Sequence, residues 1–206
     1  NVETGVKSEF LGGALNTAVA LFQIIQENRA ITDPNNSNYS IAEGKVRSRG
    51  IDAEISGSIT ERWSVMAGYT FNKSEYLKSE RKTSSNVDYN KGADAKKYVP
   101  RHMFKLYTSY EIPLVGTQKL SIGTGVRYQS KTSGIYMKDN MSSGSAIKYY
   151  VPAQKGYALW DANINYLIND NFSVGLIVKN ITDKKYFYNT HNRTAGMNNF
   201  YGEPRS

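Results

Sequence analysis

The feature that most constrains this chain is an alternation of apolar and polar side chains with a period of two. The segment IDAEISGSIT, residues 51–60, places Ile51 and Ala53 on one face and Asp52 and Glu54 on the other. Because successive side chains of a β-strand point to opposite faces, this period is typical of a strand with one apolar and one polar face. The same alternation recurs over 63–72, 104–112, 120–130, 160–168 and 172–180, and more weakly over 2–10 and 14–26. The sequence therefore predicts an all-β chain of eight consecutive strands.

Strand length favours a membrane protein. Most of the predicted strands are about ten residues long, which is what a tilted barrel strand needs to cross a bilayer. A soluble β-sandwich also alternates, but its strands are shorter on average. No stretch approaches 18 consecutive apolar residues, so the sequence predicts no transmembrane helix. The run ALNTAVALFQIIQ (14–26) fits a helix as well as a strand, and its neighbours favour a strand.

The predicted connections alternate between short and long. Short connections fall at 12–13, 60–62, 113–119 and 169–171, and long polar ones at 27–44, 76–98, 131–156 and from 183 onward. An up-and-down barrel has tight turns on one side of the membrane and loops on the other, whereas a Greek-key sandwich has no reason to sort its loops in this way. We therefore predict a transmembrane antiparallel up-and-down β-barrel.

The aromatic side chains agree with a barrel. We expect Trp63, Trp160 and Phe172 to lie near the short connections, in a girdle at the membrane interface. The alternative is that these rings pack in a soluble core.

Composition restricts the chemistry but selects no partner. There is no Cys, which excludes disulfides and thiolate metal sites, and the two His residues, His102 and His191, have no metal-ligand spacing. The net charge of +8 indicates anionic partners such as phosphates, acidic ligands or nucleic acid. The first residues, NVETGVKSEF, show no secretion signal.

The polar face is the predicted lumen of the barrel. It carries Asp52, Glu54, Arg127, Asp161 and Asn163, which could pair with one another. An eight-stranded barrel is so narrow that its own side chains would fill the lumen. The four long connections suit a wider barrel. The chain also continues past Asn180 and reaches the turn residues GEPR, so we expect it to be part of a larger barrel.

Five motifs, in order along the chain, resemble one family. They are KVRSRGIDAEISGSIT (45–60), WSVMAGYTF (63–71), YVPRHMFKLYTSYEIP (98–113), VKNITDKKYF (178–187) and YGEPR (201–205). Together they are similar to the barrel of TonB-dependent ferric-siderophore receptors of the Gram-negative outer membrane. The similarity extends to the receptors for hydroxamate-type siderophores, of the coprogen and pyoverdine kind.

The resemblance implies a fold and a function. It implies that residues 1–206 are the C-terminal portion of a 22-stranded barrel, and that the plug domain and the final strand lie outside this sequence. The implied function is to bind an iron–siderophore chelate and import it with TonB-coupled energy. The implied partners are the ferric siderophore, the plug domain, the TonB complex, lipopolysaccharide and outer-membrane lipid, and not nucleic acid. No metal or cofactor is expected to be bound by the chain itself, because the iron arrives already chelated.

We expect the siderophore to contact aromatic and basic residues of the long connections. The candidates are Tyr136, Tyr149, Tyr150, Tyr188, His191 and Arg193. Each could instead pack against a neighbouring loop or meet lipopolysaccharide. No nucleophile, elbow or acid–base pair stands out, so an enzyme is not expected. A passive porin or a self-contained eight-stranded barrel remains the alternative.

Overall fold

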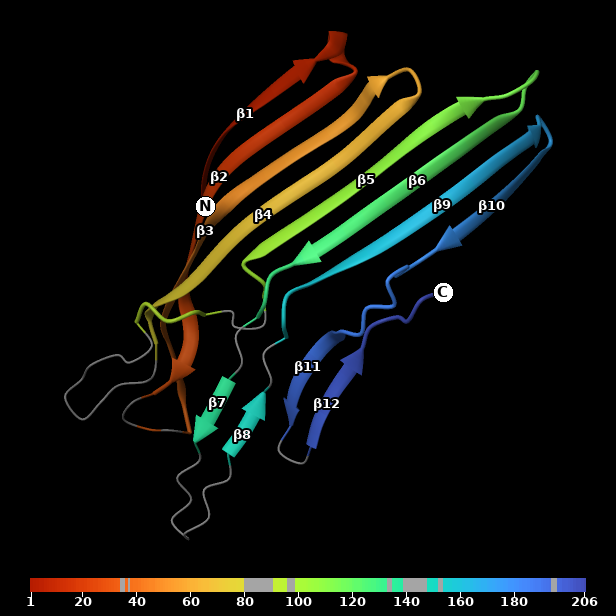
Figure 1. The fold of residues 1–206 in the computed structure, drawn as a ribbon. Helices are drawn as coiled ribbons and strands as arrows, with labels where there is room; N and C mark the ends of the chain where they lie inside the picture. Colours follow the sequence, from red (N-terminus) through yellow and green to blue (C-terminus); the bar gives the residue numbers. More distant parts are fainter. Residues whose placement is uncertain are drawn as a thin grey trace.

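A computed structural model describes residues 1–33, 36, 38–79, 91–95, 99–132, 135–138, 148–151, 154–193 and 196–206. Eight of its strands form one antiparallel sheet in which every strand pairs with its neighbours in chain order (Figure 1). They are β1 (Val2–Phe10), β2 (Leu15–Thr32), β3 (Ser40–Thr60), β4 (Trp63–Lys78), β5 (His102–Pro113), β6 (Lys119–Gln129), β9 (Tyr157–Asn169) and β10 (Phe172–Val178). The predicted all-β class and the eight antiparallel strands are confirmed.

Two further pairs of strands stand apart from the main sheet. The hairpins β7 (Ile135–Lys138) with β8 (Lys148–Val151) and β11 (Phe187–Arg193) with β12 (Gly196–Tyr201) lie at the end of the sheet that carries the long connections (Figure 1). The short connections lie at the opposite end, and the first of them is the 3-10 turn η1 (Leu11–Gly13). None of the helical segments in the described residues is long and apolar enough to span a bilayer.

The strand register sorts the side chains into two faces. One row across the sheet joins Ala18, Glu54, Gly68, Lys105 and Arg127, each opposite the next. The neighbouring row joins Val19, Ala53, Tyr69, Phe104 and Tyr128. We call the first face the polar face and the second the apolar face. The alternation in the sequence is therefore the alternation of the sheet itself.

The sheet is a single layer without an ordinary core. Among the described residues only two hydrophobic side chains, Val46 and Leu159, are buried. The apolar face is open instead, with Val19 49%, Leu21 52% and Ile122 43% exposed. An open apolar surface of this extent needs an apolar partner, and a bilayer provides one.

Three predicted strand ends were wrong. β4 is predicted over 63–72 and runs to Lys78, into the predicted connection 76–98. β2 and β3 run well beyond the predicted segments 14–26 and 51–60, so that the predicted long connection 27–44 shortens to 33–39. The pairing of β2 with β3 shifts register between Gln26 and Arg29, where Asn28 has a positive φ of 57°. This register shift interrupts the alternation of apolar and polar side chains. The parts of β2 and β3 on its long-connection side project into water in a membrane barrel, so they need no apolar face.

The other long connections hold more structure than predicted. The connection 131–156 contains β7 and β8, the region from 183 onward contains β11 and β12, and residues 91–95 form bridges with the end of β4. Residues 80–90, 96–98, 133–134, 139–147, 152–153 and 194–195 of these connections lie outside the described part of the structure. Short and long connections still alternate along the chain.

The aromatic girdle needs one correction. Trp63 and Phe172 begin β4 and β10 directly after short connections, as predicted. Trp160 lies instead near the long-connection end, because β9 already starts at Tyr157. The backbone oxygen of Trp160 accepts a hydrogen bond from the backbone N–H of Ile181 at that end. The number of residues between Trp160 and the short connection that follows β9 decides the position of this ring, and the prediction placed the two too close together.

Candidate functional site

The five predicted lumenal residues share the polar face. Asp52 and Glu54 come from β3, Arg127 from β6, and Asp161 and Asn163 from β9. The register places Glu54 in the same row as Arg127, and it pairs Asp161 and Asn163 with Gly125 and Gly123 of β6.

We expect from the sequence that the predicted lumenal residues pair with one another. Among those five residues, all of which the structure describes, there is one ion pair, between Arg127 and Asp161. Nη2 of Arg127 lies 2.9 Å from Oδ2 of Asp161, and the arginine side chain is 51% exposed. An exposed pair of this kind stabilises a fold by at most about 1 kcal/mol. Oδ1 of Asp161 also accepts a hydrogen bond of 2.9 Å from the backbone N–H of Asn180. The carboxylate therefore links the polar face to the turn that follows β10.

Asn163 is held by a tyrosine that the sequence reading did not single out. The Tyr107 hydroxyl donates a 3.1 Å hydrogen bond to Oδ1 of Asn163. Gly123 lies between them, and a Cβ at this position would meet both the hydroxyl and the Asn163 amide. The absence of a side chain at Gly123 thus makes room for the contact.

A groove of about 860 Å³ crosses the polar face from β3 to β10. Its charged and hydrogen-bonding lining consists of Glu54, Ser56, Lys105, Tyr107, Arg127, Asp161, Asn163 and Lys179. Lys105 and Arg127 are direct register partners, so two cations face each other in the groove. Lys105 was not predicted as a site residue. The alternation over 104–112 places it on the polar face, and the register of β5 against β6 would have been needed to pair it with Arg127.

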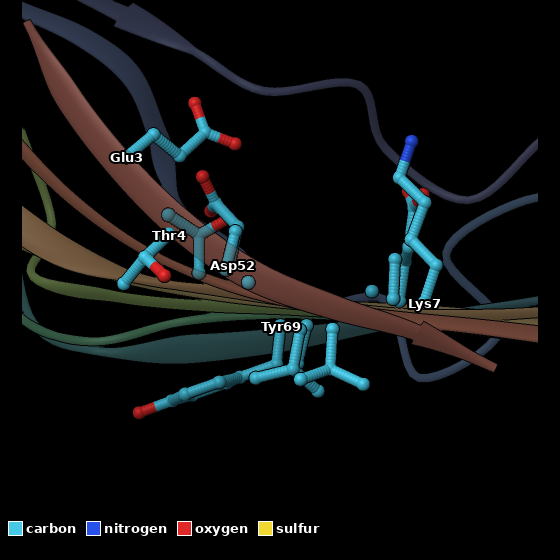
Figure 2. Close-up of a pocket in the computed structure, with 14 residues that line it drawn as sticks. Glu3, Thr4, Lys7, Asp52 and Tyr69 are labelled. Carbon is cyan, nitrogen blue, oxygen red and sulfur yellow. The ribbon is translucent and has the colours of Figure 1, made fainter.

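A second hollow of about 690 Å³ lies at the β1 side of the sheet. Figure 2 shows Glu3, Lys7 and Asp52 on one side of the strands and the ring of Tyr69 on the other. With Glu54 also in its lining, this hollow contains three carboxylates and one lysine. The polar face is therefore acidic near β1 and β3 and basic from β5 to β10.

The six predicted siderophore contacts lie on the two hairpins. Tyr136 of β7 pairs with Tyr150 of β8 in the strand register, and Tyr149 pairs with Met137. Tyr188, His191 and Arg193 lie on β11, and β11 is in contact with β8. The fold thus brings the backbones of the two groups together, while the side chains of all six lie outside the described part of the structure.

The described residues contain no group of three or more His, Asp or Glu side chains placed to hold a metal ion. His102, the one histidine whose side chain is described, lies on the apolar face in the row of Phe71. The Tyr69 hydroxyl and Nδ1 of His102 are 2.9 Å apart, and the His102 ring packs against Phe71 at a tilt of 41°, with centroids 4.9 Å apart. These contacts give His102 a packing role.

Comparison with known proteins identifies the family. Residues 1–181 match the family described as TonB dependent receptor-like, beta-barrel. The chain belongs to the TonB-dependent receptors. The expectation that it is not an enzyme is confirmed by this membership, because the family consists of receptors and transporters. Its strands belong to a Gram-negative outer-membrane barrel.

The relatives of this TonB-dependent receptor include four receptors for ferric pyoverdines. It is 37% identical to the ferric-pyoverdine M114 receptor PbuA of Pseudomonas sp. strain M114, over 99% of this chain and 23% of that protein. It is 33% identical to the ferripyoverdine receptor of Pseudomonas aeruginosa, over 100% of this chain and 24% of that protein. The chain therefore spans about a quarter of the length of these relatives.

Solved receptor structures share the fold. The crystal structure of the Pseudomonas aeruginosa ferripyoverdine receptor bound to ferripyoverdine superposes with a TM-score of 0.76 at 32% identity, over 98% of this chain and 25% of that one. The ferric-catecholate import receptor Fiu of Escherichia coli K12, in its closed form, gives 0.73 at 26% identity, over 98% and 26%. The eight antiparallel strands thus have the fold of a TonB-dependent receptor barrel, which the sequence motifs predicted, and they match about a quarter of the solved receptors.

Proposed function

We propose that the protein carrying this chain is an outer-membrane receptor that binds a ferric siderophore of the pyoverdine kind and imports it into the periplasm with TonB-coupled energy. The observation that carries the proposal is the identity of 37% and 33% to two ferric-pyoverdine receptors over essentially the whole chain. The catecholate siderophore receptor Fiu is 30% identical, below both of these values. Residues 1–206 would form the C-terminal portion of the barrel wall.

The siderophore would be bound at the two hairpins. β7–β8 and β11–β12 lie together at the long-connection end, and they carry four tyrosines, a histidine and an arginine of the predicted set. Aromatic rings and cations suit a ferric chelate with a flat, anionic surface. In this proposal the polar face lines the lumen of the barrel below the hairpins. It surrounds the plug domain of the same protein. Its acidic and basic halves would face plug residues of opposite charge.

The function is tested by transport in cells. A Gram-negative strain that lacks its own pyoverdine receptors is given the protein carrying this chain, and uptake of radioactive iron as ferripyoverdine is followed with and without a functional TonB. We expect uptake only when both proteins are present. Uptake that is independent of TonB would instead support the alternative of a passive porin, and the absence of uptake with every pyoverdine tried would reject the pyoverdine assignment.

The hairpin site is tested by substitution. We expect the double change Tyr149→Ala and Tyr150→Ala to weaken binding of ferripyoverdine by about 30-fold or more, since each binding-site aromatic contributes about 1–2 kcal/mol. The matched control is Tyr39→Ala, an exposed tyrosine in the β2–β3 connection at the same end of the sheet. Equal affinities for the double variant and the control, measured by tryptophan quenching on the purified receptor, would reject the hairpin site.

A further inference from the structure

Gln154 joins the bases of the two hairpins. It lies between β8 and the start of β9, in the connection that carries the first hairpin. Oε1 of its side chain accepts a 3.1 Å hydrogen bond from the backbone N–H of Phe187, the first residue of β11. The two residues are 33 positions apart and belong to different connections. Because the bond is made to the backbone, it determines where β11 begins relative to the end of the other hairpin.

Gln154 is itself held in place. Its backbone N–H donates a 3.1 Å hydrogen bond to Oγ1 of Thr132, and its backbone oxygen accepts one of 3.0 Å from the Thr132 N–H. Thr132 is buried and lies just after the end of β6. Nε2 of Gln154 donates a 2.8 Å bond to the backbone oxygen of Lys155. The side chain therefore uses both its acceptor and its donor, and only one orientation of the amide satisfies Phe187 and Lys155 together.

An aromatic contact lies beside this hydrogen bond. The ring of Tyr157, the first residue of β9, packs on the ring of Tyr186 with centroids 4.5 Å apart and a tilt of 33°. The backbone N–H of Gly202 donates a 2.9 Å hydrogen bond to the Tyr186 oxygen, and a Cβ at Gly202 would overlap the Tyr186 ring. Tyr186 is thus tied to the end of β12 as well. We call the four residues that connect the two hairpin bases the hairpin link: Gln154, Tyr157, Tyr186 and Phe187.

The hairpins depend on contacts at their bases. The hairpin β7–β8 is connected to β6 and β9, and the hairpin β11–β12 follows β10. Each is a two-stranded sheet that is not paired with the eight-stranded sheet. Two strands alone are at best marginally stable in water, so further contacts have to fix such a hairpin in position. The hairpin link supplies these contacts between the two bases, and β8 and β11 also touch.

The hairpin link also borders a basic surface. It lines a hollow of about 430 Å³ together with three exposed lysines. Lys155 comes from one connection, and Lys184 and Lys185 come from the other. An anionic ligand that lies across the hollow would meet lysines of both connections. The distance between these charges is therefore set by the hairpin link.

We propose that Gln154 is a positioning residue for siderophore binding, which holds the two hairpins together as one unit with the help of the Tyr157–Tyr186 contact. The inference deepens the proposed function and rests on it for the identity of the ligand. Gln154 acts through the hairpins and not by touching the siderophore. Two hairpins that are fixed relative to each other lose less conformational freedom on binding than two independent ones, and this difference strengthens binding.

The first measurement needs no siderophore. Met137→Cys on β7 and Asn198→Cys on β12 place one spin label on each hairpin of the purified protein carrying this chain, and the chain has no Cys of its own. Pulsed electron paramagnetic resonance gives the distribution of distances between the labels. We expect Gln154→Met, which has a similar size but no acceptor oxygen, to broaden the distribution at least about twofold, because the Phe187 N–H loses its partner.

Three further variants test the hairpin link. Gln154→Glu keeps an oxygen for the Phe187 N–H and should keep the distribution narrow. Tyr186→Leu removes the ring contact, leaves Gln154 in place and should broaden the distribution, so the test does not depend on one residue. The matched control is Gln118→Met, the same change in the short connection between β5 and β6, which should leave the distribution as in the parent.

The second measurement is the affinity for ferripyoverdine of the same variants without labels. We expect Gln154→Met to bind about tenfold more weakly than the parent and Gln118→Met to bind as the parent does. A distribution for Gln154→Met as narrow as that of the parent overturns the proposal, and so does a broadened distribution with unchanged affinity. A parent protein that binds no pyoverdine contradicts the proposed function instead, and the distances still show whether Gln154 joins the hairpins.

Discussion

At the scale of single residues, Gly50 shows why the motif around residues 45–60 is structural. A Cβ at Gly50 would meet the backbone oxygen of Phe71 and the ring of Phe22. Phe22 lies opposite Gly50 in the register, so its ring covers the backbone of β3 on the polar face. The glycine therefore allows an aromatic ring to pack directly on the strand.

We predict that Gly50→Ala lowers the free energy of unfolding of the receptor by about 1–3 kcal/mol, because the backbone must shift to relieve the overlap. Urea unfolding in lipid vesicles, followed by tryptophan fluorescence, measures the change. Gly68→Ala on β4 is the matched control, since a Cβ there has no atom within 4 Å, and its effect should stay within about 0.5 kcal/mol. Equal effects of the two changes would show that Phe22 moves away freely.

At the scale of elements, the turn after β10 is organised by Asn180. Its side chain is buried, and its Nδ2 donates 3.1 Å hydrogen bonds to the backbone oxygens of Lys184 and Glu203. Its Oδ1 accepts a 2.9 Å hydrogen bond from the Lys184 N–H. Asn180 also has a positive φ of 49°, which asparagine tolerates better than most residues. One side chain thus connects the end of β10 to the segment after β12.

We predict that Asn180→Ala costs about 2–4 kcal/mol, because three hydrogen bonds are lost at a buried position and backbone groups are left unpaired. Limited proteolysis should then cleave near residues 184–203 faster than in the parent receptor. Lys185→Ala, an exposed change in the same turn, should leave the cleavage rate as it was. A rate for Asn180→Ala that matches this control would mean that the backbone alone holds the turn.

The sequence predicts strands correctly where one face of the strand meets lipid and the other face does not. The predicted cores of β1, β5, β6 and β9 agree with the structure because the two environments impose the alternation. Beyond the bilayer both faces meet water, so no such pattern marks the outer parts of β2 and β3 or the short hairpins.

The same reasoning explains which residues of the candidate site could be predicted. Asp52, Glu54, Arg127, Asp161 and Asn163 could be placed on one face from parity alone, whereas the pairing of Lys105 with Arg127 and of Tyr107 with Asn163 depends on register between strands far apart in sequence.

At the scale of the whole molecule, stability comes from the sheet ladder and the bilayer and not from a core. With two buried hydrophobic side chains in the described residues, packing between layers contributes little. A Val, Leu or Ile side chain transferred from water into an apolar medium gains about 1.5–3 kcal/mol. The exposed side chains of the apolar face are numerous enough for lipid to replace the missing core. Orientation in the membrane is therefore the property on which the proposed function depends.

Orientation can be measured directly, because the chain has no native Cys. Tyr39 lies in the connection between β2 and β3 and is 66% exposed, and Val115 lies in the short connection between β5 and β6 and is 86% exposed. We predict that Tyr39→Cys reacts on intact cells with a maleimide too large to cross the outer membrane, whereas Val115→Cys reacts only after that membrane is permeabilised. The parent protein gives the background labelling. Long connections must face outward for the hairpins to meet a siderophore. The reverse labelling pattern would therefore refute the proposed hairpin site while leaving the strand topology intact. Labelling of both positions on intact cells would show that this sheet does not separate two compartments.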